Sequence, residues 1–156
     1  MKKSIQSIVT LTLICVVISA LLAAVNFVTA PIIEKAEAQK ANEALLVVMP
    51  NGKDFKELSV SDYELPSSVV NLYSEESGGY IFKMVTTGYS SGLTVMCGID
   101  KDGKVTGAVC LASGETLGYE KTYGENFKGL DASAADGVDT ISGATKTTSA
   151  YKNAIK

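Results

Sequence analysis

The feature that most constrains this chain is an uninterrupted apolar run near its N-terminus. No charged residue stands between Lys3 and Glu34, and the segment from Ser4 to Ala30 consists mostly of Ile, Leu, Val, Ala and small polar residues. About 20 apolar residues in a helix cross the roughly 30 Å hydrocarbon core of a bilayer. Because the run is much longer than the about 7–15 apolar residues of a cleaved signal peptide, it predicts a retained transmembrane anchor over residues 1–30.

The charges on either side of this run predict its orientation. Lys2 and Lys3 precede it, whereas the other flank carries acidic and basic residues together, namely Glu34, Lys35, Glu37 and Lys40. By the positive-inside rule, the N-terminus is cytoplasmic and everything after Ala30 is extracytoplasmic, in a single-pass protein of the cell membrane. Two alternatives stay open: a signal peptide cleaved after Val28-Thr29-Ala30, and a pilin-like subunit, although its early acidic residue is missing.

A second helical segment is expected directly after the anchor. Pro31 suits a first helical turn, and the pattern ends by Pro50-Asn51-Gly52. Apolar residues share one side of the segment: Ile33, Ala36, Ala41, Ala44, Leu45 and Val48. We therefore expect a juxtamembrane helical stalk over residues 31–50, followed by an extracytoplasmic domain over residues 51–156.

The remaining sequence predicts a small α+β domain with an antiparallel sheet. The polar stretch 51–77 is expected to hold one short strand, at 69–73, and stronger β patterns follow at 80–85, 93–99 and 104–111. The turn Asp100-Lys101-Asp102-Gly103 joins the last two strands as a hairpin. Apolar residues occur at both odd and even positions of these strands, which indicates that both faces of the sheet are covered. The covering helices are expected at 120–128 and from Thr147 to the end.

Composition excludes several classes of site. The chain has no His and three Cys, so it lacks the usual ligand sets for haem, iron–sulfur clusters or structural zinc, and we expect no metal site. Its net charge of −3 offers no basic surface for nucleic acid. Any redox chemistry would need an organic cofactor. Cys97 and Cys110 are expected to be diagonal neighbours in the hairpin, which favours two free thiols over a disulfide, although a disulfide stays open.

Two Gly-containing polar loops are candidates for a ligand site, Ser113–Gly118 and Asp139–Ser149. In the second loop, Gly143 and Ala144 leave the backbone uncovered, directly before an expected helix N-terminus that favours anions. Hydroxyl groups and Lys146 surround this point. A phosphate cradle and an ordinary helix N-cap both fit the composition.

The second loop resembles a known motif. Asp139-x-x-Ser142-Gly143-Ala144-Thr145 matches the D-x-x-S/T-G-A-T flavinylation motif of FMN-binding domains, the family that includes the G subunit of the Rnf electron-transport complex and the C subunit of the sodium-pumping quinone reductase Nqr. The likeness covers most of the chain. It extends to Val25–Pro31, Thr87-Gly88-Tyr89, Ile99–Val105 and Glu115-Thr116-x-Gly118.

The resemblance implies a site. Thr145 Oγ would be esterified to the phosphate of FMN by a separate flavin transferase. Ser142, Gly143, Ala144 and Thr147 would surround the phosphate, and Glu115, Thr116, Leu117 and Gly118 would lie against the isoalloxazine ring. No catalytic residue and no metal ligand is implied.

The resemblance also implies a function. The chain would be the electron-carrier subunit of an ion-translocating ferredoxin:NAD⁺ oxidoreductase of the Rnf type, with other membrane subunits as partners and no turnover alone. Alternatives are a carrier of the Nqr type, a free-standing extracytoplasmic flavin reductase, and an anchored module without flavin.

The chain departs from the family pattern at two places. Ser113-Gly114 stands where a His commonly precedes the Glu-Thr pair, and Leu117-Gly118-Tyr119-Glu120 stands where Pro-Gly-Leu-Gly commonly follows it. The sequence also stops sooner after Thr145 than the family pattern, so we expect either a lost C-terminal helix or further residues.

Overall fold

The computed structural model describes residues 2–156 and divides into two compact units, Met1–Gln39 and Lys40–Lys156. One helix, α1 (Lys2–Val48), runs from the first unit into the second and contains Pro31 in its interior. The expectation that Pro31 occupies a first helical turn is therefore wrong. A proline removes only one helical hydrogen bond, and apolar helices tolerate this loss.

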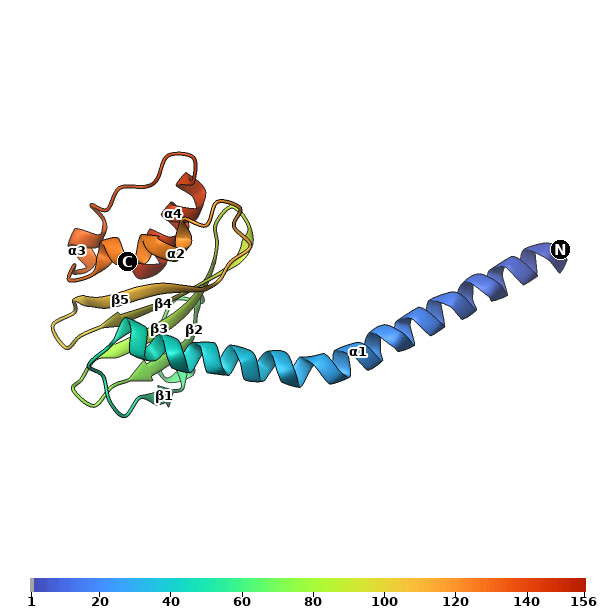
Figure 1. Ribbon diagram of the computed structural model, residues 1–156, viewed down its shortest axis with the longest axis horizontal. Helices are drawn as coiled ribbons and strands as arrows, with labels where there is room; N and C mark the ends of the chain where they lie inside the picture. The colour runs from blue at the N-terminus through green and yellow to red at the C-terminus, as the bar shows by residue number, and fades with distance from the viewer. Residues whose placement is uncertain (1) are drawn as a thin grey trace. The chain divides into compact units, whose positions relative to one another are not determined.

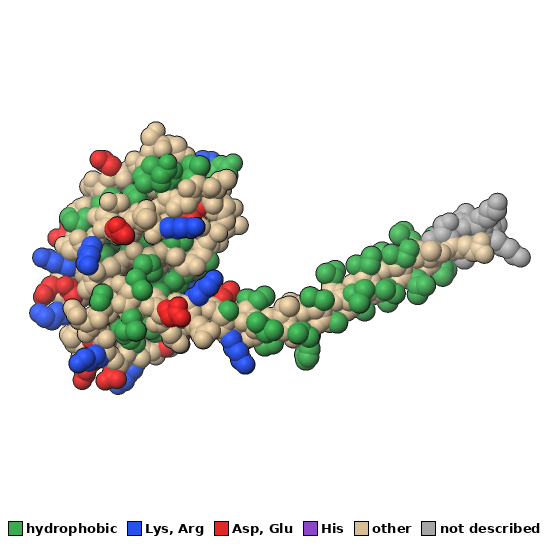
Figure 2. Space-filling model, viewed as in Figure 1, with side chains coloured by type: hydrophobic (Ala, Val, Ile, Leu, Met, Phe, Trp, Pro, Cys, Tyr) green, Lys and Arg blue, Asp and Glu red, His purple; other side chains and the backbone are tan. Residues whose placement is uncertain are grey.

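The first unit consists of the apolar part of α1. Consecutive positions such as Leu21 and Leu22 are both exposed, and Figure 2 shows hydrophobic side chains along this segment. The threonine hydroxyls donate to carbonyls one turn back, Thr10 to Gln6 at 2.9 Å and Thr29 to Val25 at 2.9 Å, so they need no water. The helix is long and apolar enough to cross a membrane.

The second unit is built on a five-stranded antiparallel sheet in the order β1-β2-β3-β4-β5. The strands are β1 (Lys56–Leu58), β2 (Val69–Ser74), β3 (Tyr80–Thr87), β4 (Ser91–Ile99) and β5 (Val105–Ala112), and the 3₁₀ turn η1 (Val60–Asp62) follows β1. Each strand pairs with its neighbour in the chain, so the sheet is a simple meander. The antiparallel sheet and the α+β class are confirmed. Among the five strands, β1 is the one that was not expected.

Each face of the sheet carries its own apolar cluster, as predicted from apolar residues at both odd and even strand positions. On one face lie α2 (Glu120–Tyr123), the 3₁₀ turn η2 (Gly124–Phe127), α3 (Ala132–Ala135) and α4 (Thr145–Ile155) (Figure 1). The last turns of α1 pack on a second cluster, through Ala41, Ala44, Leu45 and Val48 against Ile81 and Met96. The predicted stalk thus ends as part of the domain core.

A pair of glycines brings the end of α1 directly onto the sheet. A Cβ on Gly107 would meet the Val48 carbonyl oxygen at 2.9 Å, and one on Gly98 would meet it at 3.1 Å. The same carbonyl accepts a 2.6 Å hydrogen bond from Thr106 Oγ1. The sheet backbone and the C-terminal end of α1 are therefore in direct contact, which side chains at these two positions would prevent.

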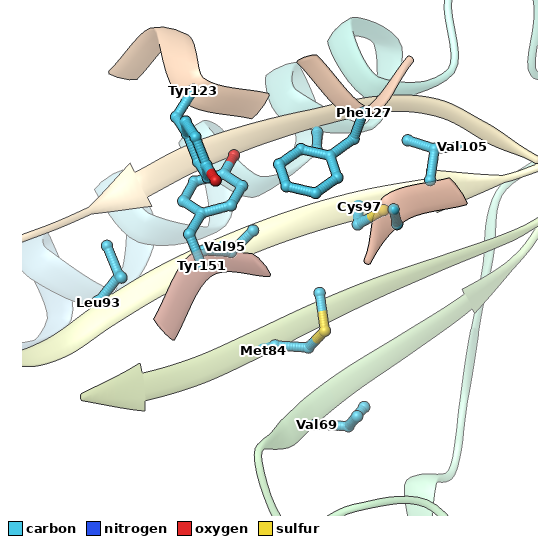
Figure 3. Packing of buried hydrophobic residues seen from close by; sticks show 11 residues of the cluster. Val69, Met84, Leu93, Val95, Cys97, Val105, Tyr123, Phe127 and Tyr151 are labelled. Atoms are coloured by element: carbon cyan, nitrogen blue, oxygen red, sulfur yellow. The ribbon is translucent and has the colours of Figure 1, made fainter. Parts of the chain in front are cut away.

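Three aromatic rings join the short helices to α4. Tyr123, Phe127 and Tyr151 pack together with centroid distances of 5.4 to 6.1 Å (Figure 3). Tyr123 also donates its hydroxyl to the Asp139 carbonyl at 2.9 Å, which ties α2 to the loop before α4. This cluster fixes the elements that carry the candidate site.

The two domain thiols lie where the hairpin register predicted. Cys97 pairs with Ala108, Cys110 pairs with Val95, and both cysteines are free thiols. Burial raises the pKa of Cys97 to about 12. Burial, followed by the charge of Glu120, raises the pKa of Cys110. The structure agrees with two thiols at diagonal positions, of which Cys97 is buried and Cys110 is half-buried.

Candidate functional site

A cavity of about 460 Å³ opens where three loops of the second unit meet. One is the turn between β3 and β4, one follows β5, and one enters α4. Its lining residues are Tyr89, Glu115, Thr116, Leu117, Tyr119, Glu120, Gly143, Ala144, Thr145, Lys146 and Thr147. The two loops singled out in the sequence, far apart in the chain, therefore form one site.

Most of the predicted binding residues line this cavity. Seven of the nine do so, and the exceptions are Ser142 and Gly118. Four lining residues were not among the predicted ones: Tyr89, Tyr119, Glu120 and Lys146. Tyr89 belongs to the Thr87-Gly88-Tyr89 segment of the resemblance and Lys146 follows Thr145, so their positions gave a signal. Glu120 stood out only as a departure from the family pattern, because its burial depends on the packing of a four-residue helix.

The N-terminus of α4 faces this cavity without a side-chain cap. Its N-cap residue is Ala144, and within the described residues no side chain bonds this helix end as a cap. Thr148 N donates to Ala144 O at 3.0 Å, so the amides of Thr145, Lys146 and Thr147 precede the first helical bond. The helix begins two residues earlier than expected. The ordinary N-cap interpretation is thus wrong, and the phosphate cradle at this helix end stays a prediction.

The hydroxyl groups of this loop have different partners. Thr148 Oγ1 accepts from Ile141 N at 3.2 Å and donates to Ala144 O at 3.0 Å, and Thr147 Oγ1 donates to Glu115. Both residues are buried; Thr148 bonds within its own loop, whereas Thr147 bonds to the loop that carries Glu115. Thr145 is exposed and lines the cavity. Among the loop hydroxyls, Thr145 therefore combines access from solvent with a place on the cavity wall.

Glu115 holds the three segments together. Its Oε1 accepts from Ser90 N at 3.0 Å, and its Oε2 accepts from Tyr89 N at 3.2 Å and from Thr147 Oγ1. Gly88 permits this approach, since a Cβ there would meet Glu115 Oε1 at 2.7 Å. Burial alone would raise the pKa of Glu115, but the hydrogen bonds from Thr147, Ser90 and Tyr89 outweigh it and hold the pKa below its ordinary value.

This arrangement predicts an acid-labile site. A group whose pKa is lower in the folded state stabilises the fold above its unfolded pKa of roughly 4.3, and this contribution disappears as the pH falls through the folded value. The melting temperature of the wild-type chain should thus decrease between pH 5 and pH 3 by more than that of Glu115→Gln, measured by circular dichroism. Glu125→Gln, at an exposed glutamate of η2, should follow the wild type. Equal pH profiles for Glu115→Gln and wild type would contradict the role of Glu115.

The rim of the cavity is apolar and exposed. Tyr89 is 72% exposed, Leu117 61% and Tyr119 42%. Large apolar side chains left in water around a concave site are typical of a surface that covers a ligand. A flat aromatic ring would lie against these side chains while an attached phosphate reaches the amides of α4 and Lys146. The donors, the apolar rim and the cavity together fit FMN.

Comparison with known proteins agrees with this geometry. The family model described as FMN-binding domain matches residues 88–156, which include every residue lining the cavity. A curated relative from Acetobacterium woodii is 30% identical over 158 residues, covering 87% of this chain and 75% of the relative. That relative is the G subunit of the Na⁺-translocating ferredoxin:NAD⁺ oxidoreductase complex.

These matches define the class of the protein. Residues 88–156 match the FMN-binding domain. The chain belongs to the family of the Rnf complex G subunit, and the resemblance stated from the sequence is confirmed.

Proposed function

We propose that this chain carries FMN in a phosphoester bond to Thr145 Oγ and serves as an electron carrier within an Rnf-type membrane complex. The observation that supports it most directly is the position of Thr145, an exposed hydroxyl on the cavity wall at the uncapped end of α4. FMN supplies the ability to accept and release electrons. The protein contributes binding and orientation, and no residue of the cavity needs to act as a catalyst.

The residues divide the binding task by chemistry. The amides at the start of α4 and the charge of Lys146 suit the phosphate. Tyr89, Leu117 and Tyr119 offer apolar surface to the ring. Both oxygens of Glu115 accept hydrogen bonds from the protein, so its role is to hold the three loops of the cavity together.

Membrane topology explains why a covalent bond would be useful. The flanking lysines, Lys2 and Lys3, favour a cytoplasmic N-terminus and an extracytoplasmic domain. A cofactor that dissociates there would be lost to the exterior, whereas a phosphoester keeps the site occupied whatever its affinity. A flavin transferase is the maturation partner, and the other subunits of the complex are the electron partners.

A carrier and a free-standing flavin reductase differ in turnover. The full-length chain, co-expressed with a flavin transferase and purified in detergent, should show a fluorescent band on a denaturing gel. Dithionite should reduce its flavin stoichiometrically, while steady oxidation of NADH by a small acceptor stays at the background rate. Sustained turnover without other subunits would favour the reductase, and a band without fluorescence would favour a module lacking flavin.

The similarity to the Acetobacterium woodii subunit favours the Rnf type over the Nqr type. The Acetobacterium woodii protein belongs to a ferredoxin:NAD⁺ oxidoreductase complex and matches most of this chain. We therefore favour ferredoxin and NAD⁺ as the end partners of the complex, with ion translocation carried out by other subunits.

A further inference from the structure

A second carboxylate on the cavity wall, Glu120, has an unsatisfied oxygen. Glu120 is 2% exposed although it belongs to the four-residue helix α2. Its Oε1 accepts a 2.6 Å hydrogen bond from Ser113 Oγ, whereas its Oε2 is buried and has no partner within the described part of the chain. Leaving a buried carboxylate oxygen without a partner is energetically costly, so a donor is expected at this position.

The two glutamates of this wall differ in their capacity to bind a ligand. Both oxygens of Glu115 are occupied by donors of the protein. Glu120 retains a free acceptor oxygen, and the bond from Ser113 fixes the orientation of its carboxyl group. Because Glu120 also lines the cavity, a ligand there that offers an N–H or O–H group is a candidate partner for this oxygen.

We infer that Glu120 is a positioning residue for the flavin, accepting a hydrogen bond from one of its donors. The inference rests on the proposed function, because it requires FMN in this cavity. The donors of oxidised FMN beyond the phosphate are the imide N–H of the ring and the hydroxyls of the ribityl chain. The phosphate itself is an acceptor, so it suits the amides of α4 and Lys146 and not the carboxylate of Glu120.

This assignment also explains a departure from the family pattern. The family commonly has glycine at the end of Pro-Gly-Leu-Gly, and this chain has Glu120 at that place. A glycine there has no side chain to donate to or accept from a ligand. The contact is therefore a property of this sequence, and it compensates for the polar group that the fold buries.

The test is an NMR measurement on the full-length chain loaded with ¹³C,¹⁵N-labelled flavin through its transferase. Glu120→Leu removes the acceptor at similar bulk, Glu120→Gln keeps a weaker neutral acceptor, and Glu125→Leu removes an exposed charge nearby as the control. In Glu120→Leu the imide proton should shift upfield and exchange with water roughly tenfold faster, the effect of one lost hydrogen bond. If the donor is a ribityl hydroxyl, the ribityl carbon signals move instead. Glu120→Gln should give a smaller shift of the same signals, and Glu125→Leu none.

The possible outcomes separate the two hypotheses. If the wild-type chain acquires no flavin, the proposed function fails and this inference fails with it. If it acquires flavin but the signals of Glu120→Gln and Glu120→Leu coincide with those of the wild type, only the role of Glu120 is overturned, and water is the partner of Oε2. If Glu120→Leu does not fold, Glu120→Gln alone decides, because a neutral acceptor binds an N–H or O–H about half as strongly as a carboxylate.

Discussion

Replacing Thr145 with valine is expected to abolish the covalent flavin completely. Valine has nearly the shape of threonine and lacks only the hydroxyl oxygen that would form the phosphoester. Thr145 is exposed at the start of α4 and makes no contribution to the buried core, so the fold should persist. After co-expression with a flavin transferase, the variant band should be dark under ultraviolet light while its circular dichroism spectrum matches the wild type.

The control for this variant is Thr140→Val. Thr140 is an exposed hydroxyl of the same loop, it does not line the cavity, and it occupies a variable position of the motif. It should retain full fluorescence. Covalent flavin in Thr145→Val, or its loss in Thr140→Val at unchanged folding, would contradict the assignment of Thr145.

The largest effect on stability is expected from Gly124→Ala. Gly124 lies at the junction of α2 and η2, pressed against β5, and an added Cβ would overlap the Ala108 carbonyl oxygen and come within 2.5 Å of the Tyr151 hydroxyl. The Ala108 carbonyl belongs to β5, which is hydrogen-bonded to β4, so this backbone cannot move aside easily. We expect the free energy of unfolding to decrease by about 3 kcal/mol, which lowers the melting temperature by roughly 10 °C or more.

Gly137→Ala is a matched control for this variant. Its nearest contact would be the Ala134 carbonyl oxygen at 3.3 Å, and its backbone is not in the left-handed region. Its melting temperature should change by the equivalent of less than about 1 kcal/mol. If thermal unfolding by circular dichroism showed equal changes for both variants, the close packing of η2 on β5 would be wrong.

The elements with strong periodic patterns were predictable from the sequence. The apolar run, the strands from β2 to β5 and the hairpin at Gly103 depend on local patterns of hydrophobicity and turn residues, and their positions agree within two residues. The register that sets Cys97 opposite Ala108 follows directly from that hairpin. The local sequence was sufficient to predict elements whose structure depends on short-range hydrophobic patterns and turn residues.

The elements that were missed depend on contacts distant in sequence or on single side chains. β1 has three residues and forms because it pairs with Leu72, Tyr73 and Ser74 at the C-terminal end of β2. α3 has four residues and is stabilised by Asp131, whose side chain accepts from Ala134 N at 2.9 Å. Such segments are too short to show a helical or strand period.

The candidate site was only partly predictable for a similar reason. Thr145 and the Glu115 loop stood out through a motif, but the motif does not reveal that Glu115 is bonded to Ser90, Tyr89 and Thr147. The burial of Glu120 follows from how α2 packs against β5 and α4. The different hydrogen bonding of the two glutamates therefore became visible only in three dimensions.

The central claim, that Thr145 carries the flavin, is tested most directly by mass spectrometry of the tryptic peptide 129–146. Trypsin cleaves after Lys128 and Lys146, and the peptide contains Thr145 together with Ser133, Thr140 and Ser142 as competing hydroxyls. We expect a peptide heavier by one FMN less water, with fragment ions that place the added mass on Thr145. An unmodified peptide from a flavinylated chain, or an added mass on Ser133, Thr140 or Ser142, would contradict the assignment of Thr145.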